Sequence, residues 1–416
     1  MATAAGGAIP QLRICMVAAC PFPANHGTPG AIREMAEGLA GLGHDVRVVT
    51  YHYGEDIPVR GVAVDRIRRL LREQAVAVGP TIRRPLYDLQ MIFTTLRVVR
   101  RHRPHVLHAH GYEATLIAAV CRMFTGVPVI YSAHSTMVDE LPSFEFIRPQ
   151  WLAVSFARAL DAVVPALADR CLPHSSNSAR FLERQGLRER TDDVVNFGLD
   201  VEWMGGGDGT GLRERHGLGQ RPVILYTGVL DRFQRLELLL QATALVATRY
   251  PSVRLLVVST LPQAQYAEAL RAEAVRLGIA DRVVITEPQP LEAVRDILHV
   301  ADVAVVPRPA MPGVPIKLLN YMAAGRPAVL FASTASAGIV HRQHAMLASP
   351  DTPQALATEM LALLDDPQLR EDIGRRARDF VRVHHAREAI AGQVSRCYER
   401  VLQSHTRKRE CHAFSS

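Results

Sequence analysis

The sequence lacks several features that would have assigned this 416-residue chain to a special class of protein. Its six cysteines include no C-x-x-C pair and no metal-site spacing. No stretch approaches the roughly 18 consecutive apolar residues that a membrane-spanning helix requires. The first ten residues carry no basic side chain, so we expect no secretory signal. No nucleic-acid-binding motif is present. We therefore expect a cytoplasmic protein with no nucleic-acid partner.

What the sequence does contain is typical of a globular protein of two to three domains. Apolar residues make up 48% and charged residues 21% of the chain. The formal net charge of +7 favours anionic partners, such as a nucleoside diphosphate or an acidic membrane surface.

The first half of the chain alternates strand and helix patterns. A strand over 12–19, a loop over 21–30, a helix over 31–42 and a strand over 46–50 predict a βαβ unit that opens a doubly wound domain. Further strands are expected over 106–110, 127–131 and 162–165, with helical patterns between them.

A second alternating series follows the glycine-rich stretch 205–209, which is typical of a flexible joint. It predicts strands over 222–226, 253–259, 283–286 and 303–306, helices over 236–249, 263–277 and 291–298, and a last helix over 387–403. The sequence thus predicts an α/β protein with two Rossmann-like, doubly wound domains facing a central cleft. The expected parts are a first domain over 1–203, a second over 204–385, a helix over 386–404 packing back on the first domain, and a disordered tail over 405–416.

The segment 312–331 is the most informative one. Pro315 suits the first turn of a helix, Gly325 suits its end, and residues 328–331 suggest a buried strand. The free N–H groups at the start of such a helix attract anions, so a phosphate fits there. Lys317 adds positive charge in the first turn, and Asn320 lies one turn further on, where it can meet a ribose hydroxyl.

This segment resembles the nucleotide-sugar loop of GT-B glycosyltransferases, most closely the retaining "group 1" transferases of family 4. In that family two glutamates spaced E-x7-E frame the loop, and the second holds the donor ribose. Pro312 and Asn320 occupy those positions here, so both carboxylates are absent, although an asparagine can still bond a ribose. The remaining frame, from Pro315 through Lys317 to Pro327, is intact. The resemblance extends over roughly residues 12 to 400.

The resemblance indicates further donor contacts. Gly27 and Thr28 stand where the family has a glycine-rich loop beside the donor phosphates, although an ordinary strand–helix turn is the plainer interpretation. Over 226–239 the family carries an arginine and a lysine that bind the diphosphate. Val229 and Gln234 occupy those positions here, so Arg232 and Arg235 are candidate replacements. The candidate donor-binding residues are Gly27, Thr28, Arg232, Arg235, Val314, Ile316, Lys317 and Asn320, with Arg308 as an additional cation.

Two histidines are the candidate catalytic residues. His110 ends the strand over 106–110, and His134 follows the carboxyl end of the next strand. The family places a histidine at the second location near the transferred sugar. An imidazole there can bond a sugar hydroxyl, steady the departing phosphate or relay a proton, and a structural hydrogen bond at a strand end is the alternative.

The stretch from Arg66 to Arg103 is rich in arginine, with apolar residues between the arginines. One interpretation is a basic amphipathic surface that binds a membrane peripherally at its inner face, as in family members with lipid acceptors. The other interpretation is a solvated arginine-rich helix face.

We therefore expect a glycosyltransferase that moves a sugar from a nucleotide diphosphate sugar, UDP-linked rather than GDP-linked, to a saccharide, a lipid-linked saccharide or a secondary metabolite. The family implies retention of configuration and no metal or other cofactor, and no D-x-D motif is present. Two alternatives stay open. The missing carboxylates and cations suit a catalytically degenerate scaffold or nucleotide-sugar binder, and a sugar-nucleotide epimerase is the other alternative.

Overall fold

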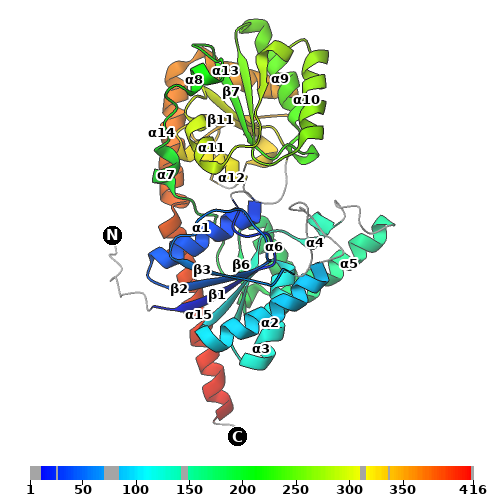
Figure 1. Cartoon of the computed structure of the whole chain (residues 1–416), viewed down its shortest axis with the longest axis vertical. Coiled ribbons are helices and arrows are strands. Elements are labelled where there is room, and N and C mark those ends of the chain that lie inside the picture. Colours follow the sequence, from blue (N-terminus) through cyan, green and yellow to red (C-terminus); the bar gives the residue numbers. More distant parts are fainter. Residues whose placement is uncertain are drawn as a thin grey trace. The chain divides into compact units, whose positions relative to one another are not determined.

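The computed structural model describes residues 11–24, 27–69, 84–141, 149–309, 315–335 and 338–413. The chain forms two compact α/β units. One comprises residues up to Gly198 together with Arg387 onward, and the other comprises Leu199–Ala386 (Figure 1). Residues 199–203, which the sequence analysis assigned to the first domain, thus belong to the second unit. Within the described residues, no helix combines the length and apolar character needed to cross a bilayer.

The first unit has a parallel six-stranded sheet in the order β3-β2-β1-β4-β5-β6. Its strands are β1 (Arg13–Ala18), β2 (Asp45–Thr50), β3 (Val62–Arg66), β4 (Val106–His110), β5 (Val129–Ala133) and β6 (Arg170–Pro173). Its helices are α1 (Gly27–Gly41), α2 (Arg84–His102), α3 (Tyr112–Thr125), α4 (Met137–Glu140), α5 (Gln150–Val163), η2 (Pro165–Leu167), α6 (Ser176–Arg184), η3 (Arg188–Arg190) and α15 (Arg387–Ala413).

The second unit repeats this topology, with the order β12-β11-β10-β7-β8-β9, again parallel. Its strands are β7 (Val223–Gly228), β8 (Arg254–Ser259), β9 (Val283–Ile285), β10 (Val303–Val306), β11 (Ala328–Phe331) and β12 (Met346–Ala348). Its helices are α7 (Val201–Gly205), α8 (Leu212–Arg215), η4 (Arg232–Gln234), α9 (Leu236–Arg249), α10 (Ala264–Arg276), η5 (Ala280–Arg282), α11 (Leu291–Leu298), α12 (Ile316–Ala323), η6 (Ala332–Thr334), α13 (Pro353–Asp365) and α14 (Pro367–His384).

Both orders are those of a doubly wound Rossmann-like sheet, as the sequence predicted. The strand order reverses between β1 and β4 in one unit and between β7 and β10 in the other. Ligands of such sheets bind beyond the carboxyl ends of the strands at this switch point. The topology therefore directs attention to the residues that follow β1, β4, β7 and β10.

Helices cover both faces of the first sheet, so both faces are buried. Alternate residues of β1 point to these opposite faces. Ile14 and Met16 pack in a core with α1 and α15, whereas Cys15 and Val17 pack in another core with α2 and α3. The final helix α15 thus completes the first unit. It runs to Ala413, whereas the sequence analysis expected a disordered tail from 405.

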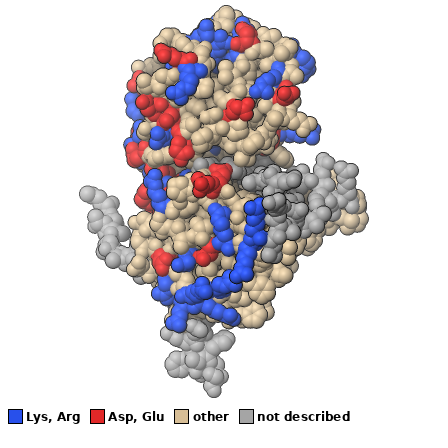
Figure 2. Space-filling view, viewed as in Figure 1, with Lys and Arg blue, Asp and Glu red and all other residues tan. Residues whose placement is uncertain are grey.

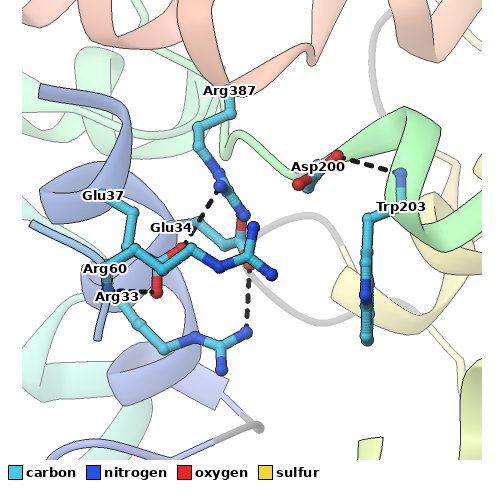
Figure 3. Close-up of polar contacts among 7 residues, drawn as sticks. All are labelled: Arg33, Glu34, Glu37, Arg60, Asp200, Trp203 and Arg387. Carbon is cyan, nitrogen blue, oxygen red and sulfur yellow. Dashed lines mark hydrogen bonds and ion pairs between the residues drawn. The ribbon is translucent and has the colours of Figure 1, made fainter. Parts of the chain in front are cut away.

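Charged side chains fix the first turn of α15 against α1 (Figure 3). The Arg387 guanidinium lies 2.6 Å from Glu34 Oε2 and 3.2 Å from Glu37 Oε2, and all three side chains are largely buried. Gly38 makes this approach possible, because a Cβ there would lie 2.8 Å from Arg387 Cγ. In the second unit, Asp200 caps α7 by accepting a hydrogen bond from the Trp203 N–H (Figure 3).

Three local expectations are corrected by the structure. The expected strand over 162–165 is wrong, because α5 continues to Val163 and a 3-10 turn follows. Helix α1 begins at Gly27 rather than Ala31, so Gly27 and Thr28 form its first turn. Pro315 is the N-cap of α12, with extended backbone, and not a residue of its first turn.

Candidate functional site

The described part of each unit has a polar centre at the carboxyl-end side of its sheet. In the first unit the centre is a row of four histidines, His108, His110, His134 and His174, which we call the histidine row. In the second unit the centre surrounds Lys317, and we call it the lysine centre.

The histidine row is built by strand geometry. His108 and His110 are two residues apart on β4 and therefore point to the same face of the sheet, with ring centroids 4.3 Å apart. His134 follows β5, and its ring lies 5.5 Å from that of His110. His174 follows β6 and stacks on His134 at 4.7 Å. Phe197 extends the stack at 5.0 Å from His174.

A chain of hydrogen bonds in this row has a fixed direction. The Val195 carbonyl can only accept, so the His174 Nδ1–H donates to it at 2.8 Å. A neutral His174 then accepts from the Ser132 hydroxyl at Nε2, over 2.9 Å. The Ser132 oxygen accepts from the His108 Nε2–H at 2.8 Å. His108 Nδ1 accepts in turn from the Tyr398 hydroxyl of α15, at 2.7 Å.

This directed chain holds only if the imidazoles are neutral, and their environment makes them so. Burial, with repulsion from His174, lowers the pKa of His108 from 6.5 to about 3. Burial lowers the pKa of His174 to about 4. Burial and the neighbouring histidines hold the pKa of both His110 and His134 well below the ordinary value. The row is therefore uncharged near neutral pH.

His110 and His134 are the pair with unused hydrogen-bonding capacity. His110 Nδ1 and His134 Nε2 are 3.2 Å apart and share one hydrogen. Among the described residues, His110 Nε2 and His134 Nδ1 have no partner although both are buried. One of these two nitrogens must be a donor and the other an acceptor, because both rings are neutral. The pair is thus able to meet a hydroxyl group, which both donates and accepts.

The other predicted residues of the first unit lie around the sheet edge. Gly27 has φ +55°, a conformation that favours glycine, and Gly27 and Thr28 are exposed in the first turn of α1. Glu113, in the first turn of α3, lies 3.5 Å from the Arg84 guanidinium.

In the lysine centre, the ammonium group of Lys317 is enclosed by residues from β7 and η4. Lys317 Nζ donates to the Tyr226 hydroxyl at 2.6 Å and to Gln234 Oε1 at 2.7 Å. It also lies 4.1 Å from the centroid of the Tyr226 ring. Gly228 ends β7 with φ +139°, and a Cβ there would lie 2.7 Å from Lys317 Nζ. A glycine at this position is therefore what lets the lysine reach the strand end.

Basic groups outnumber acidic groups in the lysine centre. Burial and the nearby Arg308 hold the pKa of Lys317 well below its ordinary value, and Asp231 offsets this only in part. Burial also lowers the pKa of Arg308, which follows β10 at the switch point. The Asp231 carboxylate is already used, because it accepts from the Phe233 and Gln234 N–H groups at 2.9 and 3.1 Å. An anion would relieve the repulsion between the two cations.

The structure separates the remaining donor-site candidates. Ile316, Lys317 and Asn320 form the partly exposed side of α12. Arg232 is exposed in η4 and has no ion-pair partner within the described part of the chain. The Arg235 guanidinium instead contacts Glu237. Val314 lies outside the described residues.

Sequence reasoning missed several members of both centres. His108 carried a signal, since it is two residues from His110 on the same strand, but His174 followed a strand of four residues that includes a proline and was not recognised. Ser132 and Tyr398 gave no local signal, because their partners are distant in sequence. Tyr226 is also distant in sequence from Lys317, which was predicted as a binding residue without its partners.

Comparisons with known proteins now bear on these centres. Residues 27–203 match the family described as Glycosyltransferase Family 4, and residues 221–366 match Glycosyl transferases group 1. The chain is 28% identical over 397 residues to D-inositol 3-phosphate glycosyltransferase 2 of Catenulispora acidiphila, covering 89% of each protein. It is 28% identical over 277 residues to D-inositol 3-phosphate glycosyltransferase of Mycobacteroides abscessus, where the match spans 60% of each.

Among solved structures, Anabaena HepE in complex with UDP-glucose is similar, with a TM-score of 0.72 and 18% identity over 95% of this chain and 100% of that one. This likeness concerns the fold alone.

Proposed function

Because the chain belongs to the group 1 glycosyltransferases of family 4 and has the GT-B fold, we propose that it transfers a sugar from a nucleoside diphosphate sugar to an acceptor hydroxyl. The observation that carries the donor assignment is the lysine centre, where Lys317 and Arg308 face a single, already bonded carboxylate at the β7/β10 switch point. A diphosphate with about two negative charges suits this excess of cations. UDP is favoured over GDP as the carrier, in keeping with the UDP-glucose bound by HepE.

The proposed donor contacts follow from the positions of the side chains. Gln234 occupies the position of the family's diphosphate-binding lysine. Lys317 takes over that role, because its Nζ donates a hydrogen bond to Gln234 Oε1. The first N–H groups of α12 add donors, and Asn320, one turn further on, meets the ribose. Arg232 is the second exposed cation beside the lysine centre, whereas the Arg235 charge is met by Glu237. Gly27, Thr28 and Val314 remain predicted contacts.

The histidine pair is proposed to bind the transferred sugar rather than to act as an acid or base. An efficient general base has a pKa near the working pH, and both His110 and His134 have pKa values well below it. Neutral imidazoles with one free nitrogen each are suited to hold a sugar hydroxyl. His134 is the catalytic candidate in this positioning sense, with His110 as its hydrogen-bonded neighbour.

We infer retention of configuration without a metal ion. The bond between the sugar C1 and the diphosphate oxygen breaks, and the electron pair leaves with the diphosphate, whose charge Lys317 and Arg308 stabilise. The acceptor oxygen then attacks C1 from the same face, and its proton passes to the departing phosphate oxygen. No protein carboxylate is required for that transfer, which is compatible with Pro312 and Asn320 at the E-x7-E positions.

The names of the relatives add one candidate to the classes of acceptor. The relatives' name, D-inositol 3-phosphate glycosyltransferase, suggests a phosphorylated cyclitol, which joins the saccharide, lipid-linked saccharide and secondary-metabolite classes. These classes are distinguished by assaying each acceptor with the same donor.

The first test is a thermal-shift panel with UDP, GDP and NAD, each with and without EDTA. A ligand at about one hundred times its Kd stabilises a protein by roughly 2.7 kcal/mol, a clear shift. We expect a shift with UDP that EDTA does not change. A shift only with NAD would contradict the donor assignment, and loss of the UDP shift in EDTA would contradict metal independence.

The product then distinguishes the alternatives. Transfer or slow hydrolysis of a UDP-sugar, with an anomeric NMR signal of retained configuration, supports the transferase. UDP binding without any turnover favours a degenerate scaffold, and conversion of one UDP-sugar into its epimer favours an epimerase.

A further inference from the structure

Asp161 of helix α5 differs in its surroundings from the other acidic residues of the chain. Figure 2 shows charged side chains exposed to solvent across both units. Three acidic side chains of the described residues are buried, and Asp161 is the least exposed of them, at 2%, against 7% for Asp192 and 8% for Glu37. Glu37 pairs with Arg387, and Asp192 pairs with Arg170. Within the described part of the chain, only neutral groups bond Asp161.

The position of Asp161 on α5 is one where helical spacing predicts an apolar residue. Ala153, Ala157 and Asp161 are four residues apart and form the buried face of the helix. Burying a carboxylate away from water and from a cation costs free energy, which hydrogen bonds from protein groups must offset. A small apolar residue would avoid this cost if α5 had only to pack on the core. Packing alone therefore does not explain the carboxylate.

The hydrogen bonds of Asp161 come from the turns that follow two neighbouring strands, β4 and β5. Its Oδ1 accepts from the Tyr112 hydroxyl and, at 2.8 Å, from the Met137 N–H. Its Oδ2 accepts from the Val138 N–H at 3.2 Å. Tyr112 is the first residue of α3, which follows β4, whereas Met137 and Val138 begin α4, which follows β5. One carboxylate thus connects both turns.

These two turns adjoin the histidine pair. Tyr112 is two residues after His110, and Met137 is three residues after His134. His134 follows the last residue of β5, so its position depends on the turn that comes after it as well as on the strand. A single hydrogen bond of 3.2 Å joins His110 Nδ1 to His134 Nε2. The spacing of the two rings therefore depends on how firmly the turns are held.

We propose that Asp161 is a positioning residue for the histidine pair. By bonding the turns after β4 and β5, it holds His110 and His134 at the spacing that a sugar hydroxyl requires. This inference rests on the proposed function, which assigns the pair to the transferred sugar. A displacement of about 1 Å in a positioned group can lower a reaction rate about a hundredfold. Asp161 is thus expected to affect kcat through the two imidazoles.

The test variant is Asp161→Asn, which keeps the shape of the side chain. Its NH2 group replaces one carboxylate oxygen and must face either the Met137 N–H or the Val138 N–H, where two donors cannot bond each other. We expect kcat for sugar transfer to fall between about tenfold and about a hundredfold. The donor KM should change little, because the diphosphate is assigned to the second unit.

Asp169→Asn is the matched control, because Asp169 holds the same strand at its other end. The Asp169 carboxylate accepts from the Val129 N–H at 2.9 Å and from the Arg122 guanidinium at 3.0 Å, at the amino end of β5. The control also removes partly buried bonds, so it should lower the urea midpoint as Asp161→Asn does. It should leave kcat unchanged, so a general loss of stability cannot account for the expected difference.

A double variant shows whether the effect of Asp161 depends on His134. In a His134→Phe chain, Asp161→Asn should lower kcat little further, because the group that it positions is absent. A merely structural role would lower kcat by the same factor in both chains. Tyr112→Phe removes only one of the three donors, and a severalfold fall in kcat is expected. It takes the place of Asp161→Asn in every measurement if that variant does not fold.

Ring-nitrogen NMR signals of the full chain test the positioning without turnover. The His134 signal, assigned by its loss in His134→Phe, should shift in Asp161→Asn and stay in place in Asp169→Asn. If the parent chain transfers no sugar, the proposed function fails, and the NMR comparison still decides the role of Asp161. The proposal is overturned if the His134 signal does not move in Asp161→Asn. It is also overturned if kcat is unchanged, or falls equally in the parent and His134→Phe chains.

Discussion

The two units have the same strand order, yet their polar centres differ in charge. The histidine row has four imidazoles whose pKa values are lowered until the row is neutral. The lysine centre has two basic groups, Lys317 and Arg308, against one occupied carboxylate. The same topology thus places groups at strand ends, while burial and neighbours decide what those groups do. Under the proposed function, Lys317 and Arg308 of the second unit bind the charged diphosphate, and His110 and His134 of the first unit bind sugar hydroxyls.

The largest expected effect comes from lowering the pH until the histidine row becomes protonated, which would remove its difference in charge from the lysine centre. An unfolded histidine takes up a proton near pH 6.5, but folded His108 and His174 do so only near about pH 3 and about pH 4. The unfolded state therefore binds more protons between these values, and stability falls as the pH is lowered. Between about pH 8 and about pH 5 these two residues cost about 4 kcal/mol in the free energy of unfolding.

A buried carboxyl group, Asp88, acts in the opposite direction. Burial raises the pKa of Asp88 to about 6, so protonation of the folded state returns about 1.4 kcal/mol at about pH 5. Urea unfolding of the full chain at both pH values measures the net loss, to which His108, His174 and Asp88 together contribute about 3 kcal/mol. Other histidines whose pKa values burial lowers, among them His110, His134, His44 and His299, add to this loss. An unchanged urea midpoint would show that the row is not held neutral. His384→Gln, at an exposed histidine of α14 outside the row, is the control substitution.

A second change interrupts the directed chain without adding charge. Ser132→Ala leaves the His108 Nε2–H and His174 Nε2 without their shared partner. Each buried group without a partner costs about 1–3 kcal/mol, so we expect a loss of about 3 kcal/mol in the free energy of unfolding.

Tyr398→Phe is the comparison within the same chain. It removes one bond, to His108 Nδ1, and should cost about half as much. Urea unfolding at neutral pH measures both. Equal losses for the two variants would contradict the observed contacts, in which Ser132 bonds two histidines and Tyr398 bonds one.

A third change removes the predicted sugar contact. His134→Phe keeps the ring that stacks between His174 and Phe197 but loses both nitrogens. We expect kcat for sugar transfer to fall about a hundredfold, as for loss of one positioned hydrogen-bonding group in a transition state. The UDP dissociation constant should change little, because the diphosphate is assigned to the other unit. A weaker UDP affinity with unchanged kcat would place His134 outside the reaction.

A fourth change tests the role of Lys317 in the lysine centre. Lys317→Met keeps a chain of similar length over the Tyr226 ring and removes the ammonium group. Hydrogen bonds to charged groups contribute about 1.5–3 kcal/mol, so UDP should bind roughly thirtyfold more weakly by calorimetry. Gln234→Met removes only a neutral partner of the lysine and is the control, with an expected change of about twofold or less. Equal effects of the two variants would argue that the lysine is structural.

The sequence was sufficient for the frame of each unit and for part of each centre. Elements with a strong local pattern, such as β4, β10, β11 and α9, were predicted at their observed bounds. Strand β6 was missed, because its short run of residues ends in a proline and the apolar run before it, which was predicted as a strand, continues helix α5 instead. Lys317 was predicted from the start of α12, but its contact with Tyr226 depends on residues distant in sequence. The pKa shifts of the histidines likewise depend on burial, which no local pattern encodes.

The smallest expected effect sharpens the assignment of the two arginines beside the lysine centre. Arg235 has a left-handed backbone, with φ +52°, and its guanidinium contacts Glu237, so Arg235→Ala should change the UDP dissociation constant by less than about twofold. Arg232 has no such partner within the described part of the chain, and Arg232→Ala should weaken UDP binding by about threefold, since an exposed cation contributes up to about 1 kcal/mol. Calorimetry at low and high salt measures both, and only the Arg232 effect should shrink with salt. A larger loss for Arg235→Ala would mean that Arg235 leaves Glu237 when the nucleotide binds.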